Sequence, residues 1–144
     1  MKIRSFNPSD EEAVVQLWRE CGLVVPWNDP HKDIQRKLKV QPEMFLVGCE
    51  DEEIITTVMV GYDGHRGWIN YLAVHPDHQL AGIGRRMMKE AENCLREAGC
   101  PKINLQIRST NTAVIAFYKA LGFKPDAAVS FGKRLEPDGV DAKI

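Results

Sequence analysis

The sequence contains no apolar run near the roughly 20 residues that a membrane-spanning helix needs. Its first residues, MKIRSFNPSDEEAV, turn acidic where an export signal would continue apolar. We therefore expect no membrane role and a cytoplasmic location. The four cysteines have no C-x-x-C spacing, so neither a zinc site nor a redox motif is indicated and no metal is expected. A net charge of −1 offers no broad basic field for nucleic acid.

The chain has the length and patterning of a mixed helix and strand domain. Its 144 residues predict a single domain over 1–144. The segment KIRSF predicts a first strand, and Asn7 with Pro8 begins a helix. Asp29 with Pro30 begins a second, basic helix. Residues 44–74 then contain three strand patterns joined by tight turns, which predict an antiparallel meander.

The second half alternates helices and strands. GIGRRMMKEAENCLREAG is the clearest helix, because its apolar residues recur at spacings of four and three. KINLQIRS predicts a strand, NTAVIAFYKALGF predicts another helix, and DAAVSFGKRLE predicts one bent strand or two short ones. The last residues, PDGVDAKI, predict a frayed tail. The fold class that these patterns favour is α+β or mixed α/β.

Two glycines, Gly82 and Gly84, stand where the third strand of the meander gives way to the long helix. A helix start has unpaired N–H groups and a partial positive charge, so it attracts phosphate where the backbone is accessible. Three basic residues follow in RRMMKE before the first acid. A polyphosphate site is the functional interpretation, and a tight turn is the purely structural one. Neither an ATP loop nor the third glycine of an NAD loop is present.

Two motifs resemble those of the GNAT superfamily of N-acetyltransferases. LAVHPDHQLAGIGRRMM resembles its acyl-CoA motif [QR]-x-x-G-x-[GA], which Gln79, Gly82 and Gly84 match. NTAVIAFYKALGF resembles the family segment N-x-x-[AV]-x-x-[FL]-Y-x-x-L-G-[FY], with Asn111 and Tyr118. The resemblance runs from residue 2 to residue 135. PWNDP, GYDGHRG and GKRL further resemble an uncharacterised bacterial subgroup, the YpeA type.

The resemblance implies a mixed, mostly antiparallel central sheet of six or seven strands, with about four helices on its two faces. The strands WINYLAV and INLQIRS would part and admit the pantetheine arm of acetyl-CoA, the implied cosubstrate. The implied cofactor-binding residues are Ala73, Val74, Gln79, Leu80, Ala81, Gly82, Ile83, Gly84, Arg85 and Asn111. Leu80 replaces a glycine of many relatives, which matters only if this residue needs a positive φ.

The reaction that the resemblance implies is direct attack of an amine on the thioester, with Tyr118 at the family's acid position. A phenol can protonate the departing thiolate. Many relatives carry Glu where this chain has Asn70, and an amide cannot accept a proton. At pH 7 a lysine amine is neutral about once in 2,500 molecules, whereas an α-amine is neutral about once in seven. We therefore predict that the acceptor is an α-amine, of a protein or small molecule, or another small-molecule amine of depressed pKa.

Other assignments stay open at this point. His65 and Tyr71 are candidates to deprotonate the amine, although a histidine in a turn such as GYDGHRG is more often simply solvated. Trp27 is a candidate cover for the acceptor pocket. A narrower activity is that of a ribosomal-protein-type N-terminal acetyltransferase. A different class is a non-catalytic acyl-CoA-binding sensor, which the missing carboxylate at Asn70 would suit. The chain is expected to be a monomer or a homodimer.

Overall fold

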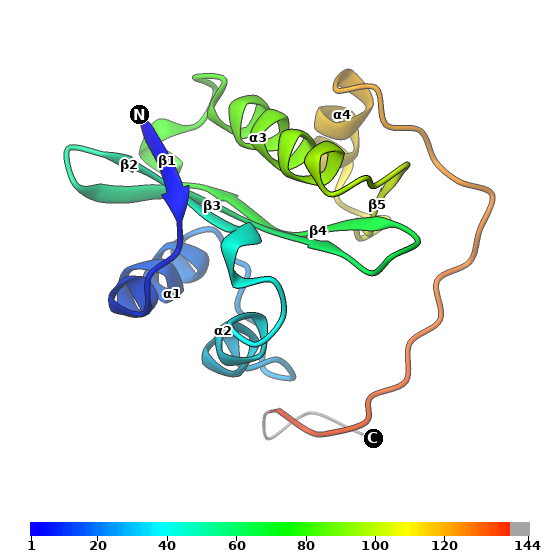
Figure 1. Cartoon of the computed structure of the whole chain (residues 1–144), viewed down its shortest axis with the longest axis horizontal. Helices are drawn as coiled ribbons and strands as arrows, with labels where there is room; N and C mark the ends of the chain where they lie inside the picture. The colour runs from blue at the N-terminus through cyan, green and yellow to red at the C-terminus, as the bar shows by residue number, and fades with distance from the viewer. Residues whose placement is uncertain (139–144) are drawn as a thin grey trace.

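A computed structural model of the chain describes residues 1–138. One sheet contains five strands in chain order: β1 (Lys2–Ser5), β2 (Phe45–Glu50), β3 (Glu53–Tyr62), β4 (Gly67–Val74) and β5 (Ile103–Leu105). The first four pair antiparallel, and β5 runs parallel to β4. Four helices cover the two faces (Figure 1), namely α1 (Glu11–Glu20), α2 (Pro30–Lys37), α3 (Ile83–Glu97) and α4 (Thr112–Ala120). None of the helices in this part of the chain is long and apolar enough to cross a bilayer.

A hydrophobic core lies on each side of the sheet. Successive strand side chains point to opposite faces, so Phe45 and Val47 of β2 pack with α1 and α2, whereas Leu46 packs with α3 and α4. The expected mixed α/β fold with four helices is therefore confirmed. Trp18 of α1 is fully buried in the first core, and Met87 of α3 is fully buried in the second.

The strand count differs from the prediction. The described residues form five strands instead of six or seven, because the segment DAAVSFGKRLE forms none. A strand needs a neighbouring backbone for its hydrogen bonds, and here side chains alone bridge residues 126–130 to β5 and its flanks. The segment leaves the end of α4 and runs in an extended path down to α2 (Figure 1). Of the tail predicted to fray, residues 139–144 lie outside the described part of the chain, while Asp138 contacts Arg36 at 2.7 Å.

A bulge in β4 breaks its register with β3. Thr57 pairs with Ala73, whereas Met59 pairs with Asn70, so Tyr71 and Leu72 together face one residue of β3. Tyr71 adopts a left-handed conformation with a φ of 51°. The hydroxyl of Thr57 donates to the carbonyl oxygen of Tyr71 at 2.8 Å and accepts the indole N–H of Trp18 at 2.9 Å. The bulge is therefore fixed by a hydrogen-bond chain that starts in the core.

β4 and β5 part soon after they meet. Their register covers only Gly67–Ile69 against Ile103–Leu105, so the remaining residues of β4, through Val74, have no ladder partner on β5. This separation lies where the GNAT resemblance expects a cleft between these two strands. It places the bulge and the end of β4 beside the opening.

Candidate active site

The loop between β4 and α3 presents its backbone outward. Gln79 turns back toward β4, because its side-chain amide donates to the carbonyl oxygen of Val74 at 3.0 Å. Leu80 and Gly82 adopt left-handed conformations with φ values of 65° and 77°. Within residues 1–138, no hydrogen bond uses the backbone N–H groups of residues 80–82. The first turn of α3 follows directly, and its first intrahelical bond runs from the N–H of Arg86 to the carbonyl of Gly82.

The two glycines of the motif serve different physical needs. Gly82 needs its positive φ, and a Cβ there would meet no atom within 4 Å. Gly84 instead lets two helices approach closely, because a Cβ there would lie 3.1 Å from the ring of Phe117 on α4 and 3.8 Å from Val74. The start of α3, the end of β4 and the middle of α4 therefore meet at Gly84. Arg85 and Lys89, both exposed, add positive charge to this helix start.

Tyr118 follows Phe117 on α4 and points into the second core. Tyr118 is 7% exposed, and its ring packs edge-on against Phe117 and Phe123. Burial raises the pKa of the Tyr118 hydroxyl to about 12. Within the described residues the Tyr118 hydroxyl has no hydrogen-bond partner. Every fully buried side-chain polar atom in this part of the chain does have one, so the hydroxyl oxygen is not fully buried. The ring is thus enclosed, while the oxygen reaches an accessible surface.

Asn111 is the N-cap of α4. Its Oδ1 accepts the N–H of Val114 at 3.3 Å, which satisfies one of the unpaired donors at the helix start. The cap leaves the Nδ2 of Asn111 as a donor. Two turns of helix, about 10 Å, separate this position from Tyr118.

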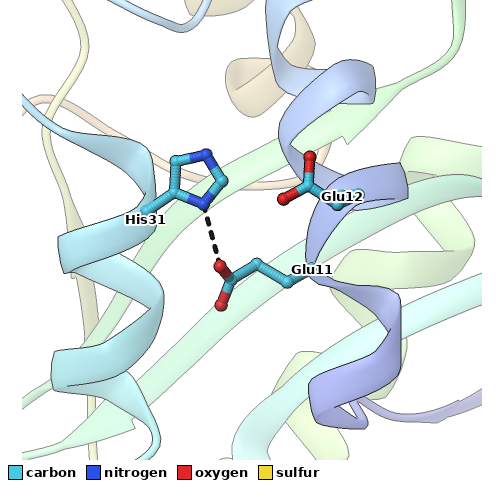
Figure 2. A group of neighbouring side chains, drawn as sticks. All are labelled: Glu11, Glu12 and His31. Atoms are coloured by element: carbon cyan, nitrogen blue, oxygen red, sulfur yellow. Dashed lines mark hydrogen bonds and ion pairs between the residues drawn. The ribbon is translucent and has the colours of Figure 1, made fainter.

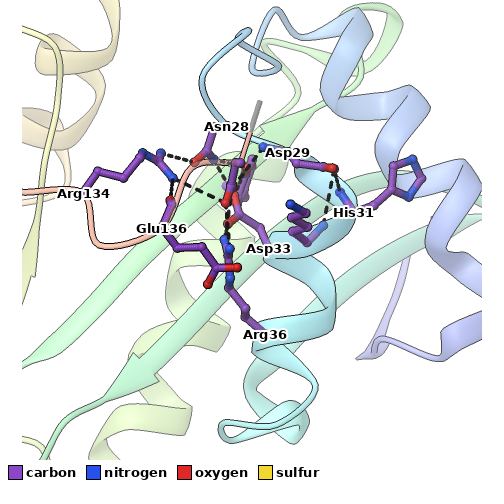
Figure 3. A network of polar contacts seen from close by, with 10 residues as sticks. Asn28, Asp29, His31, Asp33, Arg36, Arg134 and Glu136 are labelled. Carbon is purple, nitrogen blue, oxygen red and sulfur yellow. Dashed lines mark hydrogen bonds and ion pairs between the residues drawn. The ribbon is translucent and has the colours of Figure 1, made fainter. Parts of the chain in front are cut away.

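A polar network beside the bulge joins β4, the start of α2 and the extended segment that follows α4 (Figure 3). The hydroxyl of Tyr71 donates to Asp33 at 2.6 Å and accepts from Asn28 at 3.2 Å. Arg134, from the extended C-terminal segment, donates to Asn28 at 3.0 Å. Arg36 binds Asp138 through both terminal nitrogens. The C-terminal segment and α2 thereby form one wall beside the bulge.

The network bears on the predicted proton acceptor Tyr71. Burial, together with the hydrogen bond to Asp33, raises the pKa of Tyr71 well above the ordinary value. Its phenol therefore keeps its proton and acts as a donor. His65 is exposed in the turn before β4, and the length of β4 separates it from Val74 by roughly 23 Å. The structure does not bring His65 to the cleft.

Trp27 lies closer to the predicted acceptor region. Its ring is 43% exposed, and the guanidinium carbon of Arg108 lies 5.6 Å from the ring centroid. Arg108 follows β5, so this cation–π contact links the loop before α2 to the segment beyond the cleft. The contact joins the loop before α2 to the segment after β5, and Trp27 stays a candidate cover for the acceptor pocket.

A group with metal-ligand spacing also lies between α1 and α2 (Figure 2), formed by Glu11, Glu12 and His31. The Nδ1 of His31 lies 2.8 Å from one carboxylate oxygen of Glu11, and Gln35 donates to the other at 2.7 Å. Both oxygens of Glu11 are therefore engaged by α2. The group forms a side-chain bridge between the first two helices.

The comparisons place the chain in a family. The Acetyltransferase (GNAT) family matches residues 11–123, and the chain belongs to it. An acetyltransferase of Pectobacterium atrosepticum is 47% identical over 138 residues, which cover 96% of this chain and 98% of the relative. The chain is accordingly an N-acetyltransferase of this family.

Solved structures agree on the fold. Ard1 from Thermoplasma volcanium superposes with a TM-score of 0.76 at 26% identity, over 88% of this chain and 84% of that one. The ribosomal-protein-S18-alanine N-acetyltransferase from Escherichia coli superposes with a TM-score of 0.73 at 22% identity, over 88% and 79% of the two chains.

The positive φ of Leu80 leads to a stability prediction. The left-handed conformation costs a non-glycine residue about 1–2 kcal/mol, and the exposed side chain of Leu80 has no packing to lose. Glycine loses more backbone entropy on folding, which offsets part of this gain. Leu80→Gly should therefore raise the free energy of unfolding by about 0.5–1 kcal/mol. Leu80→Ala, which keeps a Cβ, serves as the matched control in thermal unfolding. Equal stabilisation by alanine would show that the leucine side chain, not the backbone, is unfavourable.

Proposed function

We propose that the protein transfers an acetyl group from acetyl-CoA to an amine by direct attack, with Tyr118 as the general acid. The observation that carries this proposal is the contact of three segments at Gly84: the end of β4, the start of α3 and the turn of α4 that contains Tyr118. The start of α3 and the turn of α4 that contains Tyr118 are thereby held together at the end of β4, where β4 and β5 have parted.

The backbone from Leu80 to Arg85 fits a pyrophosphate. The N–H groups of residues 80–82 make no hydrogen bond within residues 1–138, and the first N–H groups of α3 have no intrahelical partner. Ala73 and Val74 at the end of β4 would offer backbone groups to the thioester and pantetheine, and Asn111 would bond a pantetheine amide. Acetyl-CoA supplies the activated acetyl group as a cosubstrate.

The pKa of Tyr118 predicts a particular pH dependence. A value of about 12 keeps the phenol protonated, and therefore able to act as an acid, throughout the working pH range. The rate of acetyl transfer should rise with pH as the acceptor amine loses its proton. It should show no decline from Tyr118 ionisation until the pH approaches 12. A pH–rate profile with a falling limb near pH 10, the ordinary phenol value, would contradict this assignment.

The residues near the bulge support an acceptor that is already largely neutral. Asn70 is exposed on β4 and cannot accept a proton, and the phenol of Tyr71 is bound to Asp33. No strong base therefore faces the cleft from these positions. This arrangement favours an α-amine or another amine of depressed pKa over a lysine side chain.

The acceptor class can be tested with two matched peptides. One has a free N-terminus and no lysine, and the other has a blocked N-terminus and one lysine. At pH 7 the first should be acetylated roughly 100-fold faster or more, because its amine is neutral far more often. The advantage should shrink to about three- to fourfold at pH 10, where the α-amine is neutral and roughly a quarter of the lysine amine is neutral. Faster reaction of the lysine peptide at pH 7 would overturn the proposal.

Thiol release from acetyl-CoA is the readout, with a polyamine, an amino sugar and free amino acids added to the panel. The fold shared with the ribosomal-protein-S18-alanine enzyme makes the N-terminus of a protein the narrower candidate acceptor. A non-catalytic sensor would bind acetyl-CoA without releasing thiol in the presence of any of these amines. Family membership and the accessible Tyr118 hydroxyl favour the enzyme.

A further inference from the structure

The loop before α2 touches both sides of the place where β4 and β5 part. On one side, the Nδ2 of Asn28 donates to the hydroxyl of Tyr71, in the bulge of β4, at 3.2 Å. On the other side, the guanidinium carbon of Arg108 lies 5.6 Å from the ring centroid of Trp27. The ladder between the two strands ends at Leu105, and the backbone of Arg108 follows within about 10 Å of that point. The loop therefore holds Arg108 beside the opening between the strands.

Arg108 has no acidic partner in the described part of the chain. Its side chain is exposed, and no carboxylate of residues 1–138 forms an ion pair with its guanidinium. The arginines of the neighbouring wall differ in this respect. Arg36 binds Asp33 at 3.3 Å and Asp138 at 2.7 Å. Arg134 lies 3.4 Å from Asp138. Carboxylates therefore accompany Arg36 and Arg134, whereas the charge of Arg108 is available to a ligand.

The ring of Trp27 prepares the guanidinium of Arg108 for a planar contact. A cation over the face of an indole is held by the electrostatic attraction of the ring. The N–H donors of a guanidinium lie in its own plane, so an aromatic ring below that plane leaves them free. Two parallel N–H groups match the two oxygens of a carboxylate. Arg108 is thus already positioned and has donors to offer.

The acetyl-CoA motifs and the loop before α2 lie on opposite faces of the sheet (Figure 1). Tyr118 packs in the core with α3 and α4, while Tyr71 packs against the core with α1 and α2. In a direct transfer the amine must reach the thioester from a side that the cofactor leaves open. An acceptor that enters from the α2 face passes Trp27 and Arg108 before it reaches the end of β4.

We propose that Arg108 binds a carboxylate of the acceptor. The preferred substrate is then an α-amine with an acidic group in its first or second residue, or a small molecule with the same two groups. The inference rests on the acetyl transfer proposed above and adds the second group by which the acceptor is recognised. A carboxylate fits this position because one guanidinium fork matches its two oxygens and its single charge.

The first test compares peptides that differ in one group. Both members of a pair have a free N-terminus and no lysine, and one begins with aspartate where the other begins with asparagine. A second pair has the same difference at the second residue. Thiol release from acetyl-CoA is measured at about pH 9, where these α-amines are largely neutral. In at least one pair the acidic peptide should have a kcat/KM about 10-fold higher, the size expected of a charge-assisted hydrogen bond.

Variants of Arg108 should change this ratio in opposite senses. Arg108→Gln should reduce it to about 1, because an amide has no charge to attract the carboxylate. Arg108→Glu should invert the preference, so that a peptide with arginine in place of aspartate becomes the better substrate. Each variant is compared with itself on two peptides, so a general loss of activity leaves the ratio unaffected. Arg96→Gln removes an equal charge from the exposed face of α3, and its ratio should stay near that of the wild type.

The α-amides of aspartic acid and asparagine repeat the comparison without a peptide chain. A preference in this pair would extend the proposal to small acceptors, and one confined to the peptides would narrow it to protein N-termini. Equal rates within every pair, or a ratio that Arg108→Gln leaves unchanged, would overturn the role of Arg108 while acetyl transfer stands. Failure to release thiol with any of these amines would instead overturn the proposed function, and the role of Arg108 with it.

Discussion

Tyr118→Phe should lower kcat for acetyl transfer about 100- to 10,000-fold, the usual contribution of a positioned general acid. The reason is that the phenylalanine ring fills the same space but cannot protonate the departing thiolate. The hydroxyl makes no hydrogen bond within residues 1–138, and the ring packs through its edges. The substitution should therefore leave the thermal stability unchanged, and the Kd for acetyl-CoA should stay within a factor of about three.

The matched control is Tyr62→Phe. Tyr62 ends β3 and packs partly buried against the same core, but it lies at the hairpin end of the sheet, away from Gly84. Its replacement should leave kcat unchanged. Steady-state kinetics of both variants, with acetyl-CoA binding measured by calorimetry, separates a chemical role from a structural one. An unchanged kcat in Tyr118→Phe would remove Tyr118 from catalysis.

Thr57→Val should lower the free energy of unfolding by about 2–4 kcal/mol. The change keeps the side chain's shape but removes the hydroxyl that joins Trp18 to the bulge. Both Trp18 and Thr57 are fully buried, so the indole N–H and the carbonyl of Tyr71 would each lose a partner, at about 1–3 kcal/mol per unsatisfied group. Urea unfolding monitored by tryptophan fluorescence measures the effect.

Thr57→Ser is the control for that prediction. Serine keeps the hydroxyl and loses only a methyl group, so its cost should be about 1 kcal/mol. Thr56→Val is a second comparison, because the Thr56 hydroxyl donates to the carbonyl of Ala73 but receives no indole N–H. If Thr57→Val and Thr57→Ser were equally stable, the hydrogen-bond chain would not hold the bulge.

The periodic elements could be predicted from the sequence because their signals are local. Asp29 and Pro30 begin α2 as expected, since the carboxylate of Asp29 accepts the N–H of His31. The spacing of apolar residues defined α3, and its Met87, Ala91 and Leu95 are buried. The proposed cofactor loop was also found from local signals, namely the two glycines at a helix start. Whether leucine is unfavourable at position 80, where many relatives have glycine, depends on the φ of this residue. That φ is positive, and the sequence alone could not show it.

The rest depends on contacts between distant segments. The network of Asn28, Asp33, Tyr71 and Arg134 joins residues up to 106 positions apart, and no spacing pattern marks it. The resemblance of PWNDP and GKRL to the YpeA-type subgroup drew attention to both segments, but it did not indicate that they meet. The strand predicted in DAAVSFGKRLE failed for a related reason: alternation shows that a segment suits a sheet, but not whether a neighbouring backbone is present to pair with it.

The extended path from α4 to α2 also has a consequence for proteolysis. An exposed extended segment with few backbone hydrogen bonds is what proteases cleave first. Residues 124–134 offer trypsin the bonds after Lys133 and Arg134, because Pro125 blocks the bond after Lys124. A cut after Lys133 would release Arg134 and Asp138 from their contacts with the loop before α2 and with Arg36. Gly82, Gly84 and Tyr118 all precede that cut. Limited digestion should therefore divide the molecule into two parts. The larger fragment still contains the acetyl-CoA motifs, and the short peptide carries the residues that contact α2 and the loop before it.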